Sequence, residues 1–204
     1  AFNDASRHLR AGFGAAELSV DTDWARWRLS GLWASGERDP YGGTATGYDA
    51  IFENPVFAGA DTSFWIRQSV PFIGGGGVAL STRNGVLNDL RSSKEHGQSN
   101  FDNPGTQLIG AGADFDLMPV LRLSANANYL RFDNTAVLEA ARNQGDINRE
   151  IGYDLSAALI WRPLMTQNIV LRLSGAWLVP GEGFRQLFPD VTPYSVLGNL
   201  ILSY

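Results

Sequence analysis

Apolar and polar residues alternate along this chain in long, regular runs. From Leu121 to Tyr129 every odd position is apolar, while the even positions include Arg122, Asn126 and Asn128. Successive side chains of a β-strand point to opposite faces of a sheet, so a period of two predicts a strand with one apolar and one polar face. The chain is therefore expected to be an all-β protein.

The same alternation recurs in six further stretches. Strands are predicted over about residues 9–20, 25–33, 109–117, 151–161, 169–179 and 194–204. The first is less regular because Glu17 falls on its apolar face, and a β-bulge near Ala15 and Ala16 would restore the phase. The runs are about 9–13 residues long, which exceeds the ~5–6 residues of a typical globular strand and suits the ~9–11 residues of a tilted membrane-spanning strand.

Short and long connections alternate between these strands. The short connections are 21–23, 118–119 and 163–167, and the long ones are 37–106, 134–149 and 180–193. Short turns on one side and long loops on the other are typical of outer-membrane barrels. We therefore predict one antiparallel up-and-down transmembrane β-barrel domain over residues 1–204, located in the lipid of a bacterial outer membrane. A water-soluble antiparallel barrel or sandwich with aromatic residues in its core is the alternative.

Aromatic residues stand near the ends of the apolar faces. Trp and Tyr are enriched at both lipid–water interfaces of membrane barrels, because their rings combine an apolar body with a polar group. The predicted aromatic girdles contain Trp27, Trp33, Tyr129, Tyr153, Trp161 and Trp177.

The number of strands bears on closure. Seven strands are predicted, whereas bacterial single-chain barrels have an even number. Any further spanning strands within residues 37–106 must come in pairs, because that segment leaves and re-enters on the same side. At least one strand is therefore expected before Ala1, so that the chain is the C-terminal part of a larger barrel.

Residues 37–106 form the longest connection, and its structure is open to several interpretations. Residues 63–72 read partly as a strand, Gly74–Gly77 as a turn, and residues 78–82 as a returning strand. The segment could hold a pair of spanning strands, an extracellular hairpin or a loop folded into the lumen. We expect a partly ordered loop that is extracellular or folded into the lumen.

The last predicted strand ends in an alternating pattern with a terminal aromatic residue. Its members are Val196, Gly198, Leu200, Leu202 and Tyr204. This pattern resembles the C-terminal signal that the barrel assembly machinery recognises in Gram-negative outer-membrane barrels, which implies that this machinery is a partner. Residues 47–55 and 89–103 are similar to a loop of large porin-like proteins, including alginate-export-type barrels. No substrate is inferred from this second resemblance.

The polar face of the strands is the candidate functional surface. In a membrane barrel this face points into the lumen. The predicted pore-lining residues are Arg26, Arg28, Asp114, Arg122, Asn126, Asn128, Asp154 and Arg172. In a wide barrel they would line a water-filled channel, and in a narrow barrel Arg and Asp would pair as a packed polar core.

We expect a porin-like channel for small hydrophilic solutes, with a preference for anions suggested by the arginines. The alternatives are a structural barrel that sheaths a periplasmic or extracellular protein partner, such as an electron-transfer protein, and an outer-membrane enzyme. The enzyme is disfavoured because only His8 and His96 could act as a histidine base, and neither stands in a recognisable catalytic pattern.

The remaining chemistry excludes several classes of function. The chain has no Cys, so it forms no disulfide and no thiolate metal site, and the spacing of its loop acids fits no standard calcium loop. A formal charge of −5 gives no indication of a nucleic-acid partner. We expect no catalytic residue, metal or cofactor.

Overall fold

A computed structural model describes residues 7–50, 57–74, 77–93, 96–164 and 168–203. Its main element is one seven-stranded sheet in the order β11-β10-β9-β8-β7-β3-β2, in which every neighbouring pair is antiparallel. The strands are β2 (Phe13–Thr22), β3 (Ala25–Ala34), β7 (Thr106–Met118), β8 (Leu121–Arg131), β9 (Glu150–Trp161), β10 (Ile169–Pro180) and β11 (Tyr194–Leu202). The prediction of an all-β, antiparallel up-and-down arrangement of seven long strands is confirmed.

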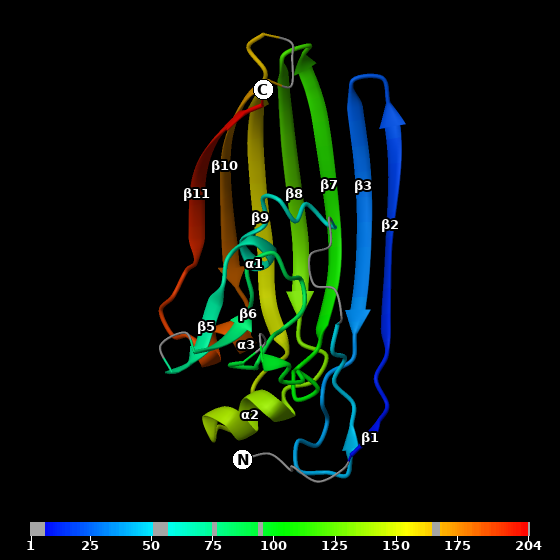
Figure 1. Cartoon of the computed structure of the whole chain (residues 1–204), viewed down its shortest axis with the longest axis vertical. Helices are drawn as coiled ribbons and strands as arrows, with labels where there is room; N and C mark the ends of the chain where they lie inside the picture. Colours follow the sequence, from blue (N-terminus) through cyan, green and yellow to red (C-terminus); the bar gives the residue numbers. More distant parts are fainter. Residues whose placement is uncertain (1–6, 51–56, 75–76, 94–95, 165–167, 204) are drawn as a thin grey trace.

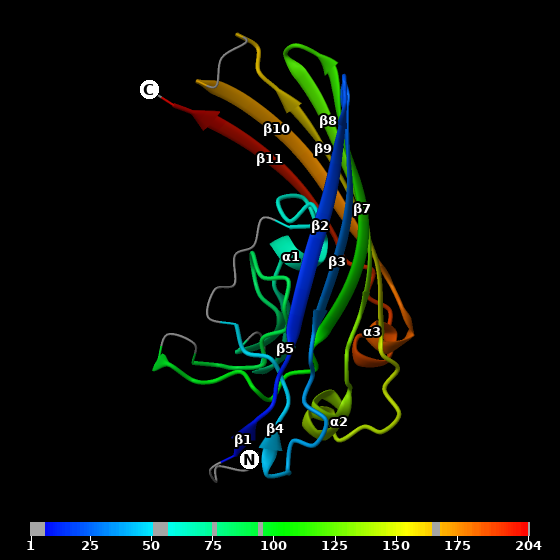
Figure 2. The same cartoon turned by 90° about the vertical axis from the view of Figure 1, so that its right-hand side faces the viewer.

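The sheet is bowed, and it has two free edges within the described residues. β2 and β11 each have a strand partner on one side only, and Figure 2 shows the curved sheet with α1 (Phe64–Arg67) on its concave side. An even number of antiparallel steps separates β2 from β11, so these two edge strands run in the same direction. The described chain thus forms a curved wall and not a closed barrel.

The first long strand differs from the sequence prediction. β2 pairs with β3 residue for residue from Phe13 opposite Ala34 to Thr22 opposite Ala25. The predicted bulge near Ala15 is therefore wrong. Leu9 lies in a separate short strand, β1 (His8–Leu9), which pairs in parallel with β4 (Thr44–Ala45). The long strand starts at Phe13, so the alternation counted from Leu9 does not apply to it. Leu9 therefore does not decide the face of the sheet on which Glu17 lies.

The long connections gather at one end of the sheet, and the short turns lie at the other (Figure 1). The long connections carry α1, the β5–β6 hairpin (Val70–Ile73 and Val78–Ser81), α2 (Ala136–Arg142) and α3 (Glu182–Leu187). Residues 64–67 are helical and β5 pairs only with β6, so a pair of spanning strands in this connection is wrong. Across the described ranges, no helix combines the length and apolarity needed to cross a membrane.

The buried apolar cluster lies between the long-loop end of the sheet and the connection between β3 and β7. The sheet contributes Leu32, Leu108, Leu130 and Leu178, one from each of four strands. The connection contributes Trp65, Ile66, Phe72 and Leu80. These leucines share the face that carries the arginines, so the connection packs on the same face of the sheet as the predicted pore-lining residues.

Candidate functional site

The concave face of the sheet, here called the inner face, changes in character along the strands. Apolar side chains such as Leu108 and Leu130 occupy it at the long-loop end, amides such as Asn128 lie in the middle, and charged groups such as Arg122 and Asp114 lie toward the short turns. The apolar end binds the connection between β3 and β7 through hydrophobic burial. The charged end of the inner face is not covered by this apolar packing, so its side chains make polar contacts.

Asp154 of β9 fixes the start of helix α1 on the inner face. Its carboxylate accepts hydrogen bonds from the Ser63 hydroxyl, from the Phe64 N–H at 3.1 Å and from the Trp65 N–H at 2.8 Å. The Asp154 residue has no exposed surface, so these donors replace the water that a buried carboxylate needs. A four-residue helix cannot persist alone, and this contact gives it a capped N-terminus.

The segment Phe57–Trp65, here called the inner segment, makes a second set of contacts before the helix. The Ala58 carbonyl accepts from Asn128 Nδ2 at 2.9 Å, and the Ala58 N–H donates to Glu17 at 3.0 Å. Asn126 Nδ2 donates to Thr62 Oγ1 at 3.3 Å. Gly59 has φ +71°, and a Cβ there would lie 2.2 Å from the Asn126 side chain, so only glycine suits this close approach.

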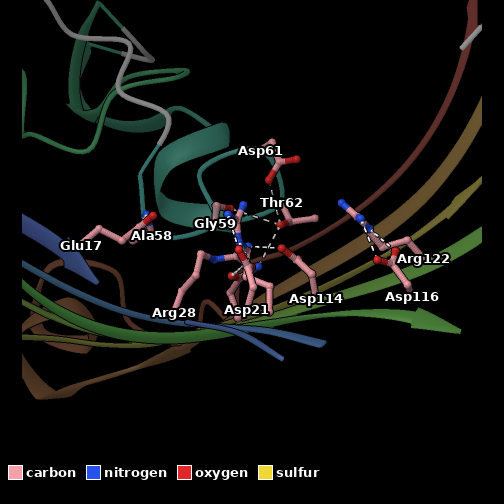
Figure 3. A network of polar contacts seen from close by, with 12 residues as sticks. Glu17, Asp21, Arg28, Ala58, Gly59, Asp61, Thr62, Asp114, Asp116 and Arg122 are labelled. Carbon is pink, nitrogen blue, oxygen red and sulfur yellow. Dashed lines mark hydrogen bonds and ion pairs between the residues drawn. The ribbon is translucent and has the colours of Figure 1, made fainter. Parts of the chain in front are cut away.

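Each predicted inner-face arginine is paired with a carboxylate. Arg26 binds Asp21 and Arg122 binds Asp116, each through Nε and Nη2 with a shortest distance of 2.6 Å. Figure 3 shows the Arg122–Asp116 pair beside the inner segment. The other two pairs are Arg28 with Asp114 and Arg172 with Asp61. The positive charge that the sequence suggested for this face is therefore balanced by acids.

Two adjoining cavities lie at the charged end of the inner face, and the first of them lies between this face and the inner segment. The first, of about 280 Å³, is bounded by Ala58–Asp61 and by charged side chains of β2, β3, β7 and β8. The second, of about 230 Å³, is lined by Asp21, Asp23, Ala25, Arg26, Asp114, Asp116 and Arg122. They share Arg26, Asp114 and Arg122, and together we call them the inner groove.

The predicted pore-lining residues thus separate into two groups. Asn126, Asn128 and Asp154 are buried beneath the inner segment and hold it. Arg26 and Arg122 are partly exposed in the inner groove, with side-chain exposures of 52% and 39%. Their lining of a pore stays a prediction. Contacts of Glu17, Asp61 and Ser63 were not predicted from the sequence, because their partners are distant in the chain.

The predicted girdle residues lie on the outer face in two bands. Trp33, Tyr129 and Tyr153 lie toward the long loops, where the two tyrosine rings are 5.1 Å apart. Trp27 and Trp161 lie toward the short turns, and Trp177 pairs with Leu155, two residues inward from Tyr153. Trp24 lies in a turn and was not predicted by the alternation. Its ring lies 5.6 Å from the ring of Phe115 in a tilted arrangement, and Phe115 also contacts Trp27.

Trp33 also connects the outer face to the loops through Asp133. The carboxylate of Asp133 accepts from Trp33 Nε1, Gln107 Nε2 and the Gly36 N–H at 2.7–2.9 Å. Partial burial acts to raise the pKa of Asp133, but these hydrogen bonds outweigh it, and the pKa lies below its usual value. The charged form of Asp133 therefore stabilises this junction.

The predicted assembly-signal residues occupy the edge strand β11. Val196, Leu200 and Leu202 are exposed on its outer face, and Gly198 belongs to the same row. Tyr204 lies outside the described residues. Recognition by an assembly machinery stays a prediction.

The absence of a catalytic function stays a prediction. His8 is exposed in β1 and His96 is exposed in the connection between β6 and β7, and no three described His, Asp or Glu residues are grouped to hold a metal ion. The chain matches no protein-family model, no curated protein and no solved structure. The outer and inner faces of the sheet are therefore the features that bear on function.

Proposed function

We propose that the seven-stranded sheet is the wall of a porin-like β-barrel in a bacterial outer membrane, through which small hydrophilic solutes pass. The observation that carries the proposal is the apolar outer face. Large side chains are exposed there on six of the seven strands, among them Leu18, Leu29, Ile109, Leu155, Leu173 and Leu200. Water-soluble proteins rarely expose a continuous apolar surface of this extent, whereas a barrel in lipid requires one.

The spacing of the aromatic bands supports a lipid environment. Tyr153 and Trp161 lie near opposite ends of β9, and eight residues of antiparallel strand span about 27 Å. Tilted by about 40°, as strands of membrane barrels are, this span covers about 20 Å of depth, close to the ~25 Å apolar band of an outer-membrane barrel. Aromatic rings at both limits of the band would then lie at the two lipid interfaces.

The proposal includes closure by strands beyond these seven. Open edges within lipid would leave backbone N–H and C=O groups unsatisfied, at a cost of several kcal/mol each. Because β2 and β11 run in the same direction, an all-antiparallel barrel built on this sheet needs an odd number of further strands between them.

The inner segment would narrow such a channel from one wall. Passage would then depend on the width left by residues 57–65 and on the polar groups of the inner groove. Because every inner-face arginine named above has a carboxylate partner, the proposal does not include the expected preference for anions. A sheath around a partner protein has no observation in its favour among the described residues, since the inner segment already covers part of that face.

Adjacent residues on opposite faces of β2 test the membrane environment. Leu18 points outward and Ser19 inward, and both are exposed. In lipid, Leu18→Arg should cost about 2–4 kcal/mol, whereas Ser19→Arg should cost far less. Both substitutions should be nearly neutral in a water-soluble protein, because exposed surface changes rarely exceed about 0.5 kcal/mol. Folding titrations into vesicles distinguish the cases, and equal effects at the two positions would contradict a lipid-facing outer surface.

Conductance tests the channel itself. The protein reconstituted into planar bilayers should give stable ion currents in potassium chloride. Deletion of residues 57–62 removes much of the material over the inner groove and should increase the single-channel conductance. A protein that inserts into bilayers and carries no current would refute the channel.

A further inference from the structure

Most of the charges in the inner groove are joined in pairs of opposite sign. Its acids are Glu17, Asp21, Asp23, Asp61, Asp114 and Asp116. The cations in its lining are Arg26, Arg28 and Arg122, and Arg172 reaches the groove through its pair with Asp61. Four of the six carboxylates are thus paired with arginines, and Glu17 and Asp23 leave a small excess of negative charge.

The ion pairs leave both donors and acceptors facing the groove. Arg26 and Arg122 each use Nε and Nη2 to bind a carboxylate, and no described residue accepts from their Nη1 groups. Each carboxylate oxygen can accept more than one hydrogen bond. The exposed pairs on β2, β3, β7 and β8 thus present donors and acceptors side by side.

Such a surface suits hydroxyl groups better than ions. A hydroxyl donates one hydrogen bond and accepts others, so a polyhydroxylated molecule can pair with both partners of an ion pair. A small ion in the same place is attracted by one partner and repelled by the other, while it gives up part of its hydration. The two cavities, of about 280 and 230 Å³, are each slightly smaller than the ~300–1,000 Å³ of typical small-ligand sites, so each suits a small solute.

We infer that the inner groove is a transit site for small uncharged polyhydroxylated solutes, of about the size of a monosaccharide, and that it favours cations over anions only weakly. This inference rests on the proposed channel function. Arg122, Asp116, Arg26 and Asp21 are its specificity-determining residues, because their pairs are the most exposed in the groove.

The test uses glucose as the probe and a charge-neutral double variant. In planar bilayers, glucose should reduce the potassium chloride current of the wild-type protein in a saturable way. The reversal potential in a salt gradient should give a cation-to-anion permeability ratio above one but below about ten. Asp116→Asn combined with Arg122→Gln keeps the net charge and removes one pair. It should raise the half-blocking glucose concentration about tenfold, the effect of losing about one hydrogen bond to a charged group.

Matched variants separate this effect from misfolding and from charge. Asp190→Asn with Arg38→Gln makes the same type of change in the loops and should leave the glucose response as in wild type. Insertion of the groove double variant into bilayers with a stable current, whatever its size, shows that this variant is folded. Arg122→Glu alone changes the net charge and should shift the permeability ratio toward cations.

Three outcomes overturn the inference. They are a wild-type preference above about tenfold for ions of either sign, a wild-type current that glucose does not reduce, and a glucose response that the groove variant leaves unchanged. In each of these cases the protein still conducts, so the proposed channel stands. A protein that carries no current refutes the channel and the inference together.

Discussion

Removal of the Asp154 carboxylate should release the inner segment from the sheet. Asp154→Ala leaves the Ser63 hydroxyl and the N–H groups of Phe64 and Trp65 without their acceptor. Each buried donor left unpaired costs about 1–3 kcal/mol. Part of that loss is recovered when the segment shifts or water enters, so a net loss of about 3 kcal/mol is expected, comparable to breaking other buried charge interactions.

Hydrogen exchange measures this loss where it occurs. A change of about 3 kcal/mol raises the local opening constant roughly hundredfold, so the amides of residues 63–66 should exchange about a hundred times faster. Trp65 and Ile66 remain packed in the apolar cluster, so the amides of β8 and β9 should change little. In the proposed channel, the same variant should increase conductance or its fluctuation.

Ser156 provides a matched control on the same strand and face. Its hydroxyl is buried and has no hydrogen-bond partner, so Ser156→Ala removes a polar atom without breaking a contact. Exchange in residues 63–66 should then stay within about threefold of wild type. If Asp154→Ala changes exchange there by less than about tenfold, or if Ser156→Ala has an equal effect, Asp154 does not anchor the segment.

Three further predictions concern the segment and the loops. Gly59→Ala forces a Cβ against Asn126 at positive φ and should lower stability by about 1–3 kcal/mol in denaturant unfolding. The charged form of Asp133 is favoured on folding, so its stabilisation should be lost as pH falls below the usual aspartate pKa of about 3.9, and Asp133→Asn should flatten this dependence in unfolding curves from pH 6 to 2. Arg142 stacks 4.6 Å from the Phe72 ring, so Arg142→Ala should cost about 0.5–2 kcal/mol in thermal unfolding, and Arg142→Lys less.

Much of the sheet could be predicted from the sequence, because strand alternation is a local property. The run from Leu121 to Tyr129 predicted β8, and the structure extends it only to Arg131. The first strand failed at its start, since nothing local separates Leu9 from the run that begins at Phe13. The alternation of this strand was therefore counted from Leu9, which belongs to a different strand.

Helix α1 could not be predicted in this way. Phe64, Ile66 and Val70 alternate with other residues in the manner of a strand, yet residues 64–67 are helical. A helix this short depends on its cap, and the cap comes partly from Asp154, about ninety residues later in the chain. One available signal was overlooked: Leu32, Leu108, Leu130 and Leu178 interrupt the polar face at the same end of four strands. Such a patch predicts that a loop covers it.

The sequence alone determined which residues form strands and which of them share a face, because a pleated backbone turns alternate side chains to opposite sides whatever lies beside it. Only the tertiary structure decided what the inner face does with its charges. Strand register places Arg26 opposite Asp21 and brings Arg28 to Asp114, while the path of the connection brings Asp61 to Arg172. These pairs join residues as far as 111 positions apart, and no local pattern records a contact of that range.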